Sequence, residues 1–175
     1  IAEQGPKAFY RGDIARRIAA EMKSGGGLIT MDDLAGYRAV LRKPVAGTYR
    51  GYDVRSMPPP SSGGVHIVQI LNILEGYDLA ALGPNSAASI HLMAEASKRA
   101  YADRATHLGD PDFWPVPTDK LVSKDYAALL RDGIAHNKAT PSSEIAPMKV
   151  APKEGPNTTT FTAVPYTQLN LPPNP

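Results

Sequence analysis

The stretch VAGTYRGYDVRSMPPPSSGGVHIVQILNIL, residues 45–74, combines two strand-like runs, a proline-rich loop and a long apolar run. β-Branched and aromatic residues over 45–57 predict an antiparallel hairpin that turns at Arg50 and Gly51. The run after the loop is apolar on nearly every face, which is typical of a buried helix. We therefore predict a hairpin followed by a buried helix over residues 65–75.

Two helices are predicted before this hairpin. Apolar residues recur at three- and four-residue spacing over residues 12–23, which makes one apolar stripe, and Asp13 is the expected cap. The glycines at 25–27 end this helix, because glycine accepts the left-handed conformation found at helix ends. Thr30, with Asp33 three residues on, has the pattern of a capping box at the start of a short helix.

A long helix is predicted after residue 85, followed by a short one in the run SKDYAALLRDGI. The long helix extends over residues 86–107, and Asn85 or Ser86 is its expected cap. We expect this helix to share one core with those near 12–23 and 65–75. Its predicted inward-facing residues are Ile90, Met93, Ala94, Ala100 and Tyr101.

Charged residues form two groups, one within the long helix and one around its C-terminal end. Arg99 lies four residues from both Glu95 and Asp103, a spacing that stabilises a helix by a few tenths of a kcal/mol per pair. A second group of charges surrounds the helix end, and its members are Asp103, Arg104, Asp110 and Asp112. This group could be a paired-carboxylate acid/base site. We favour a salt-bridged helix end and turn.

Composition excludes several classes of function. The 175 residues are 42% hydrophobic and 21% charged, which is ordinary for a soluble globular protein of about one domain. A net charge of +2 argues against a nucleic-acid or membrane surface, and no apolar run approaches the roughly 18 residues of a membrane span. The absence of cysteine excludes disulfides, thiolate metal sites and a cysteine nucleophile. The opening IAEQGPKAFYRGD is not a signal peptide and reads like the middle of a longer chain.

Histidines and serines offer few catalytic signals. The four histidines lack metal-ligand spacing with a nearby Glu or Asp. His66 lies in the apolar run, so we predict a buried core histidine rather than a ligand or base. Ser61 or Ser62 could be a nucleophile, but SSGG lacks the Gly-x-Ser-x-Gly pattern of a nucleophile elbow. The PPPSSGG segment could also dock as polyproline; we favour a rigid loop with a serine capping the next helix.

Several motifs occur in a distinctive order along the chain. The PPPSSGG loop is followed by AYADR at 100–104, LGDPDF at 108–113 and GPNTTTFTAV at 155–164. Together they resemble the gamma-glutamyltransferase (gamma-glutamyltranspeptidase) family, from the C-terminal half of the large subunit through the processing junction into the small subunit. The resemblance covers nearly the whole chain, from about Ala8 to Val164.

This resemblance implies the fold and the division of the chain. The expected fold class is α+β, the helix-rich part of an N-terminal-nucleophile hydrolase αββα sandwich, with a small antiparallel hairpin. Residues 1–157 would be the C-terminal half of the large-subunit region, and 158–164 the start of the small subunit. Residues 165–175 form a divergent proline-rich tail.

The resemblance also implies a threonine nucleophile at the run NTTT. Precursors of this family cut themselves before a threonine, and the matching autoprocessing bond is Asn157–Thr158. Thr159 and Thr160 are alternatives, but matching Phe161 to the family's aromatic residue favours Thr158. A threonine hydroxyl needs a base, which its freed α-amine can supply, and attack on the preceding carbonyl gains from proximity.

The implied activity is gamma-glutamyl transfer or hydrolysis. The donor would be glutathione, glutamine or another gamma-glutamyl compound, and the acceptor would be water, an amino acid or a peptide. The reaction would be ping-pong through a threonine ester, with no cofactor and no metal, in the periplasm or outside the cell. No nucleic acid or membrane partner is expected.

The expected partners are the N-terminal half and the small subunit of the same precursor, or zymogen, so we expect this chain alone to be an inactive fragment. Two alternatives stay open: a cephalosporin-acylase-like amidohydrolase, and a non-catalytic, truncated helical module.

Overall fold

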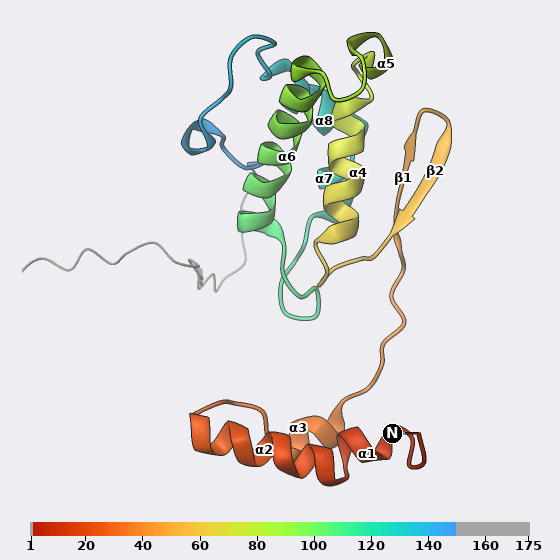
Figure 1. Ribbon diagram of the computed structural model, residues 1–175, viewed down its shortest axis with the longest axis vertical. Coiled ribbons are helices and arrows are strands. Elements are labelled where there is room, and N and C mark those ends of the chain that lie inside the picture. Colours follow the sequence, from red (N-terminus) through yellow and green to blue (C-terminus); the bar gives the residue numbers. More distant parts are fainter. Residues whose placement is uncertain (1, 150–175) are drawn as a thin grey trace, which may run out of the picture.

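The computed structural model describes residues 2–149, which form two parts joined by an extended segment (Figure 1). The N-terminal part contains α1 (Lys7–Tyr10), α2 (Asp13–Gly25) and α3 (Met31–Gly36). The larger part contains β1 (Val45–Tyr49), β2 (Tyr52–Ser56), α4 (Gly63–Leu74), α5 (Leu79–Leu82), α6 (Ala87–His107), α7 (Thr118–Leu121), α8 (Lys124–Asp132) and the 3₁₀ turn η1 (Ser142–Glu144).

The three N-terminal helices pack on one another and lie apart from the remaining helices (Figure 1). The rings of Tyr10 and Tyr37 stack with centroids 5.4 Å apart, and Arg11 donates a hydrogen bond to the Ala35 carbonyl. The prediction that the helix near 12–23 shares a core with the later helices is therefore wrong. Its stripe is covered by α1 and α3, and only Ala15 of α2 is fully buried.

The predicted hairpin is confirmed as an antiparallel pair in which Val45 faces Ser56 and Tyr49 faces Tyr52. Arg50 and Gly51 both have positive φ, at 49° and 84°, which matches the right-handed twist of the flanking strands. The Glu75 carboxylate accepts a hydrogen bond from the Arg50 backbone N–H at 2.6 Å, so the turn is attached to the end of α4.

Helix α4 is the centre of the larger part, with the hairpin, α6, α7 and α8 packed around it. Two apolar clusters form the core. One contains Ile73, Leu74, Leu92, Ala96, Ala127 and Ile134, and the other contains Val45, Val65, Val68 and Leu121. Full burial of a Leu or Ile side chain contributes about 1.5–3 kcal/mol. The prediction of a buried helix near 65–75 is confirmed.

The predicted inward face of α6 is mostly wrong. Ile90, Met93 and Tyr101 are 54%, 52% and 58% exposed, and Ala94 is exposed, whereas Ala100 is buried as predicted. The face that is buried contains four ionisable side chains, and its members are Ser89, Leu92, Glu95, Ala96, Arg99, Ala100, Asp103 and His107. Buried charges are tolerated only when they are paired and hydrogen-bonded, and here they are.

Helix starts agree with the sequence at α3 and α6 but differ at α2 and α4. Thr30 and Asp33 form the predicted capping box, and the Ser86 hydroxyl accepts a hydrogen bond from the Ser89 N–H at 3.1 Å. Helix α2 instead begins after Gly12, so Asp13 is its first helical residue rather than its cap.

Candidate functional site

The predicted nucleophile Thr158 and the bond Asn157–Thr158 lie outside the described residues, as do the alternatives Thr159 and Thr160. The structure describes the chain up to Lys149, eight residues before Asn157. The described part of the candidate site is therefore the approach segment, which we define as residues 135–149. This segment follows α8 and lies along α6 (Figure 1).

The first half of the approach segment is held by a buried ion pair on α6. The Glu95 carboxylate accepts from Arg99 Nη1 at 2.7 Å, and both side chains are almost fully buried. Glu95 also accepts from Lys98 Nζ and from the Thr140 N–H at 3.0 Å. Lys98 Nζ donates to the Thr140 carbonyl at 2.8 Å. Glu95 and Lys98 thus hold both polar groups of the Thr140 backbone.

The Glu95 carboxylate is ionised despite its burial. Burial alone would raise its pKa, but hydrogen bonds from Lys98, Arg99 and Thr140 outweigh that effect and lower the pKa of Glu95 to about 2. Arg99 in turn donates to the carbonyls of Leu130 and Gly133, at the end of α8. The pair therefore ties α6, α8 and the approach segment together.

The second half of the approach segment is held by Asp103, whose side chain is almost fully buried. Its carboxylate accepts from Gln69 Nε2 on α4, from the Tyr126 hydroxyl on α8 at 2.9 and 3.0 Å, and from the Met148 N–H at 2.6 Å. His107 Nε2 lies 2.7 Å from the Met148 carbonyl oxygen, which only accepts, so this nitrogen carries the hydrogen. Asp103 and His107 therefore hold both polar groups of the Met148 backbone.

Tyr126 remains a hydrogen-bond donor throughout the physiological range. Burial raises the pKa of its hydroxyl, and the negative charge of Asp103 raises this pKa further. Its proton is thus retained and directed at the two oxygens of Asp103. Spacing along the sequence paired Asp103 with Arg99, but within residues 2–149 this pair does not form, because Arg99 is bonded to Glu95 and to the end of α8. The spacing did not indicate Gln69 or Tyr126 as partners of Asp103, because they lie on other helices.

His66 is buried, as predicted, and the centroids of its ring and of the Tyr101 ring are 4.9 Å apart. Burial lowers the pKa of His66, and the nearby Arg104 cation lowers it further. Within residues 2–149, His66 Nε2 has no hydrogen-bond partner. These features describe a neutral core histidine.

The PPPSSGG segment is a loop leading into α4, as predicted. Ser61 supports the helix start, because its hydroxyl accepts from the Gly63 N–H at 3.3 Å. Ser62 occupies the cap position without a side-chain capping bond, and its hydroxyl accepts from Arg104 Nε at 3.3 Å. Neither hydroxyl is hydrogen-bonded to a histidine in the described part of the chain, so the nucleophile alternative gains no support.

The carboxylates near the end of α6 separate into two places. Asp103 faces the core, whereas Asp110 and Asp112 lie in the following turn beside Arg42. Arg42 donates two hydrogen bonds to Asp112, at 3.0 and 2.6 Å, and these bonds lower the pKa of Asp112. The preferred prediction of a salt-bridged helix end and turn is confirmed for the turn only, where the cation is Arg42 rather than Arg104. Within residues 2–149, Asp103 and Arg104 at the helix end form no ion pair, and the structure does not assemble the alternative carboxylate pair with Asp103.

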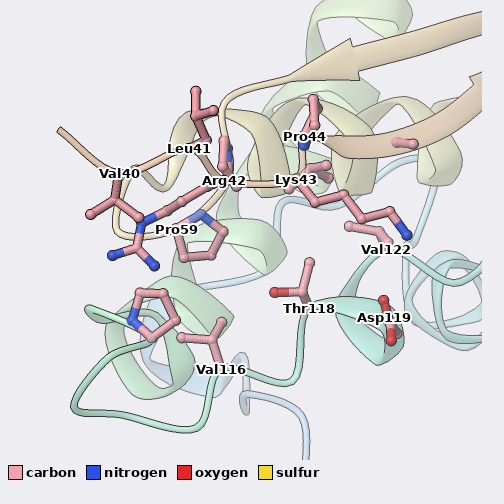
Figure 2. A pocket seen from close by; sticks show the side chains of 14 residues that line it. Val40, Leu41, Arg42, Lys43, Pro44, Pro59, Val116, Thr118, Asp119 and Val122 are labelled. Atoms are coloured by element: carbon pink, nitrogen blue, oxygen red, sulfur yellow. The ribbon is translucent and has the colours of Figure 1, made fainter.

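A cavity of about 620 Å³ lies between the extended segment before β1 and the loop before α7. Figure 2 shows Leu41, Lys43 and Pro44 on one side and Thr118 and Asp119 on the other. The lining is largely valine, leucine, proline and alanine and includes no histidine. The lining therefore offers no serine or threonine hydroxyl beside a histidine.

Two further properties concern the described residues only. Within residues 2–149, no group of three or more His, Asp or Glu side chains is placed to hold a metal ion. In the same part of the chain, none of the helices combines the length and the apolar composition that crossing a bilayer requires.

A family model described as gamma-glutamyltranspeptidase matches residues 1–168. The chain belongs to this family. The expected fold class is confirmed, because the helix-rich α+β arrangement with its hairpin resembles solved gamma-glutamyltranspeptidase structures. The match also extends across the predicted processing junction.

Three relatives illustrate the similarity. The glutathione hydrolase proenzyme of Escherichia coli K12 is 58% identical over 164 residues, covering 94% of this chain and 28% of that protein. The Helicobacter pylori gamma-glutamyltranspeptidase structure has a TM-score of 0.78 at 50% identity, covering 89% of this chain and 44% of that one. A cephalosporin acylase from Bacillus halodurans has a TM-score of 0.68 at 33% identity, covering 77% and 25%. The chain spans less than half the length of each of these three relatives.

Proposed function

We propose that this chain is the C-terminal half of the large-subunit region, with the processing junction, of a gamma-glutamyl-transferring proenzyme. The observation that carries the proposal is the family match over residues 1–168, since this range includes Asn157 and Thr158. The name proenzyme, borne by the E. coli relative, agrees with a chain that is cut to become active. We call this proposed precursor the proenzyme.

Self-cleavage would begin with Thr158. Its hydroxyl oxygen attacks the Asn157 carbonyl carbon, the peptide C–N bond breaks, and an ester forms while the threonine nitrogen takes up a proton. Water then hydrolyses the ester, which frees the hydroxyl and leaves Thr158 with an α-amine. Holding the hydroxyl near the carbonyl supplies much of the rate, because effective molarities reach on the order of 10⁵–10⁸ M in well-aligned intramolecular reactions.

The mature reaction would use the same hydroxyl. The Thr158 α-amine accepts the hydroxyl proton as the oxygen attacks the γ-carbonyl of a gamma-glutamyl donor, and the donor's amine leaves with a proton. The resulting ester is then attacked by water or by the amine of an amino acid or peptide. None of these steps requires a cofactor.

The gamma-glutamyl pocket and the oxyanion donors would come from other parts of the proenzyme. We propose that these parts correspond to the length of the relatives that this chain does not cover, and that they are its partners. We also propose a periplasmic or extracellular location, which rests on the family alone. Fractionation of cells that express the proenzyme tests that location.

A cephalosporin-acylase-like amidohydrolase is the second candidate, and the likeness to the Bacillus halodurans cephalosporin acylase supports it. The deciding experiment compares the self-cleaved proenzyme on a gamma-glutamyl anilide and on a glutaryl amide. Release of the anilide product at the higher kcat/KM supports gamma-glutamyl transfer. Preference for the glutaryl amide supports the acylase, and no turnover of either substrate supports the non-catalytic module.

A further inference from the structure

We propose that Asp103 is a positioning residue for self-cleavage, which acts with His107 by holding the Met148 backbone. This inference rests on the proposed function, because it assigns a role in cutting the Asn157–Thr158 bond. Asp103 does not touch the reacting atoms in this proposal. It acts through the approach segment, which leads to them.

The geometry at Met148 is specific. Its N–H donates to Asp103 Oδ1 at 2.6 Å, and its carbonyl accepts from His107 Nε2 at 2.7 Å. Asp103 and His107 are four residues apart on α6, so they lie on the same face in successive turns. One residue of the approach segment is thus held on both sides by one helix.

The Asp103 carboxylate is held in place by contacts other than the one with Met148. Gln69 of α4 and Tyr126 of α8 both donate to it, so three helices determine its position. A group whose orientation is set by such contacts spends little free energy on ordering when it binds the chain. Each oxygen of the Asp103 carboxylate accepts a hydrogen bond from Gln69 or Tyr126, so the bond from the Met148 N–H is additional to these.

Chain length indicates how much this anchor contributes. From Met148 to Thr158 is ten residues, which reach at most about 36 Å when fully extended. Without the Met148 anchor, the nearest backbone held by α6 is that of Thr140, eighteen residues before Thr158. The longer tether alone would slow an end-to-end encounter about two- to threefold. Losing the anchor also leaves the direction of the chain unfixed, which slows cleavage further. The upper limit of the total decrease in cleavage rate is roughly hundredfold, which corresponds to the free energy of one hydrogen bond to a charged group.

The direct test replaces the backbone donor. Met148→Pro removes the N–H that Asp103 accepts, whereas Met148→Ala removes the side chain and keeps the N–H. Both variants are made in the proenzyme, and the release of a fragment beginning at Thr158 is followed by intact mass. We expect Met148→Pro to cleave at least about twofold more slowly than Met148→Ala.

A second set of variants separates positioning from stability. Asp103→Asn keeps an acceptor oxygen and should restore part of the rate that Asp103→Leu loses. Combining Asp103→Leu with Met148→Pro should slow cleavage no further than Asp103→Leu alone, because both changes remove the same bond. Leu92→Ala creates a cavity in the core without touching the approach segment, so it should lower the melting temperature and leave the cleavage rate unchanged.

The outcomes distinguish this inference from the function on which it rests. If the wild-type proenzyme is cleaved before Thr158 and Met148→Pro matches Met148→Ala, the positioning role of Asp103 is overturned and the proposed function stands. The positioning role is overturned in the same way if Leu92→Ala slows cleavage as much as Asp103→Leu at equal melting temperature. A wild-type proenzyme that is never cut before Thr158 overturns both.

Discussion

Glu95 and Arg99 lie one turn apart on α6 and form a 2.7 Å ion pair in which both side chains are almost fully buried. The same spacing on an exposed helix is worth only a few tenths of a kcal/mol. Here the pair also holds Thr140 of the approach segment and two carbonyls at the end of α8. The pair therefore does more than stabilise its own helix, because it connects α6, α8 and the approach segment.

Glu95→Gln should make the free energy of unfolding less dependent on pH in the acidic range. The folded-state pKa of Glu95 is lowered from 4.5 to about 2, so its stabilising effect is fully present above about pH 4.5 and is lost as pH falls toward 2. This shift corresponds to roughly 3 kcal/mol at neutral pH. Urea unfolding of the proenzyme should therefore show a large difference between wild type and variant at pH 7 and a smaller one at pH 3.

Glu144→Gln is the matched control, because Glu144 lies exposed in η1 on the same segment. It should change stability by less than about 0.5 kcal/mol. A difference between wild type and Glu95→Gln that stays constant from pH 7 to pH 3 would contradict the lowered pKa of Glu95.

Gly64→Ala should be far more damaging than Gly63→Ala. A Cβ at position 64 would collide with the Met57 carbonyl oxygen, which is backbone and cannot rotate away, whereas a Cβ at 63 meets only the Ser61 hydroxyl at 3.6 Å. We expect Gly64→Ala to cost about 1–3 kcal/mol through overpacking. Thermal melting of the two variants checks this, and equal melting temperatures would show that the loop relaxes freely.

His66→Ala should reduce stability more than turnover. His66 is buried against Tyr101 at the start of α4, and its low pKa keeps it neutral. Its removal leaves a cavity, so the melting temperature of the proenzyme should fall while kcat of the mature enzyme on a gamma-glutamyl anilide changes little. A large fall in kcat with an unchanged melting temperature would give His66 a role in the chemistry.

Local patterns in the sequence predict the elements of this fold well. The helices expected at 12–23, 65–75 and 86–107 are found at Asp13–Gly25, Gly63–Leu74 and Ala87–His107. Their signals are short-range: glycine at a helix end, a serine cap and apolar spacing. The short helices α1, α5 and α7 were not predicted, because four residues are too few for a periodic pattern.

The buried face of α6 could not be predicted in the same way. Apolar periodicity placed Ile90 and Met93 inside, whereas the buried positions include Glu95 and Asp103. Carboxylates enter a core only when partners satisfy them, and these partners lie far away in the sequence. Tyr126 and Met148, for example, reach Asp103 from 23 and 45 residues along the chain. The assignment of Thr158 as nucleophile stays a prediction, because it lies outside the described residues.

Thr158→Ala in the proenzyme should leave an uncleaved, inactive precursor. Alanine has no hydroxyl to attack the Asn157 carbonyl, and no α-amine is released at position 158 to act as a base. The expected result is a single band at the precursor mass, with no turnover of a gamma-glutamyl anilide. Intact mass and N-terminal sequencing of the product measure the first outcome, and anilide release measures the second.

Thr159→Ala is the matched control, since it removes a hydroxyl one residue along and keeps the predicted nucleophile. This variant should still be cut, and the new N-terminus should read Thr-Ala-Thr-Phe. Cleavage of Thr158→Ala before residue 159, together with an uncut Thr159→Ala, would move the nucleophile one place along the chain. A nucleophile at Thr159 would lie only one residue further from Met148 than Thr158, so the approach segment could position either threonine. The N-terminal sequence of the released fragment therefore decides between Thr158 and Thr159.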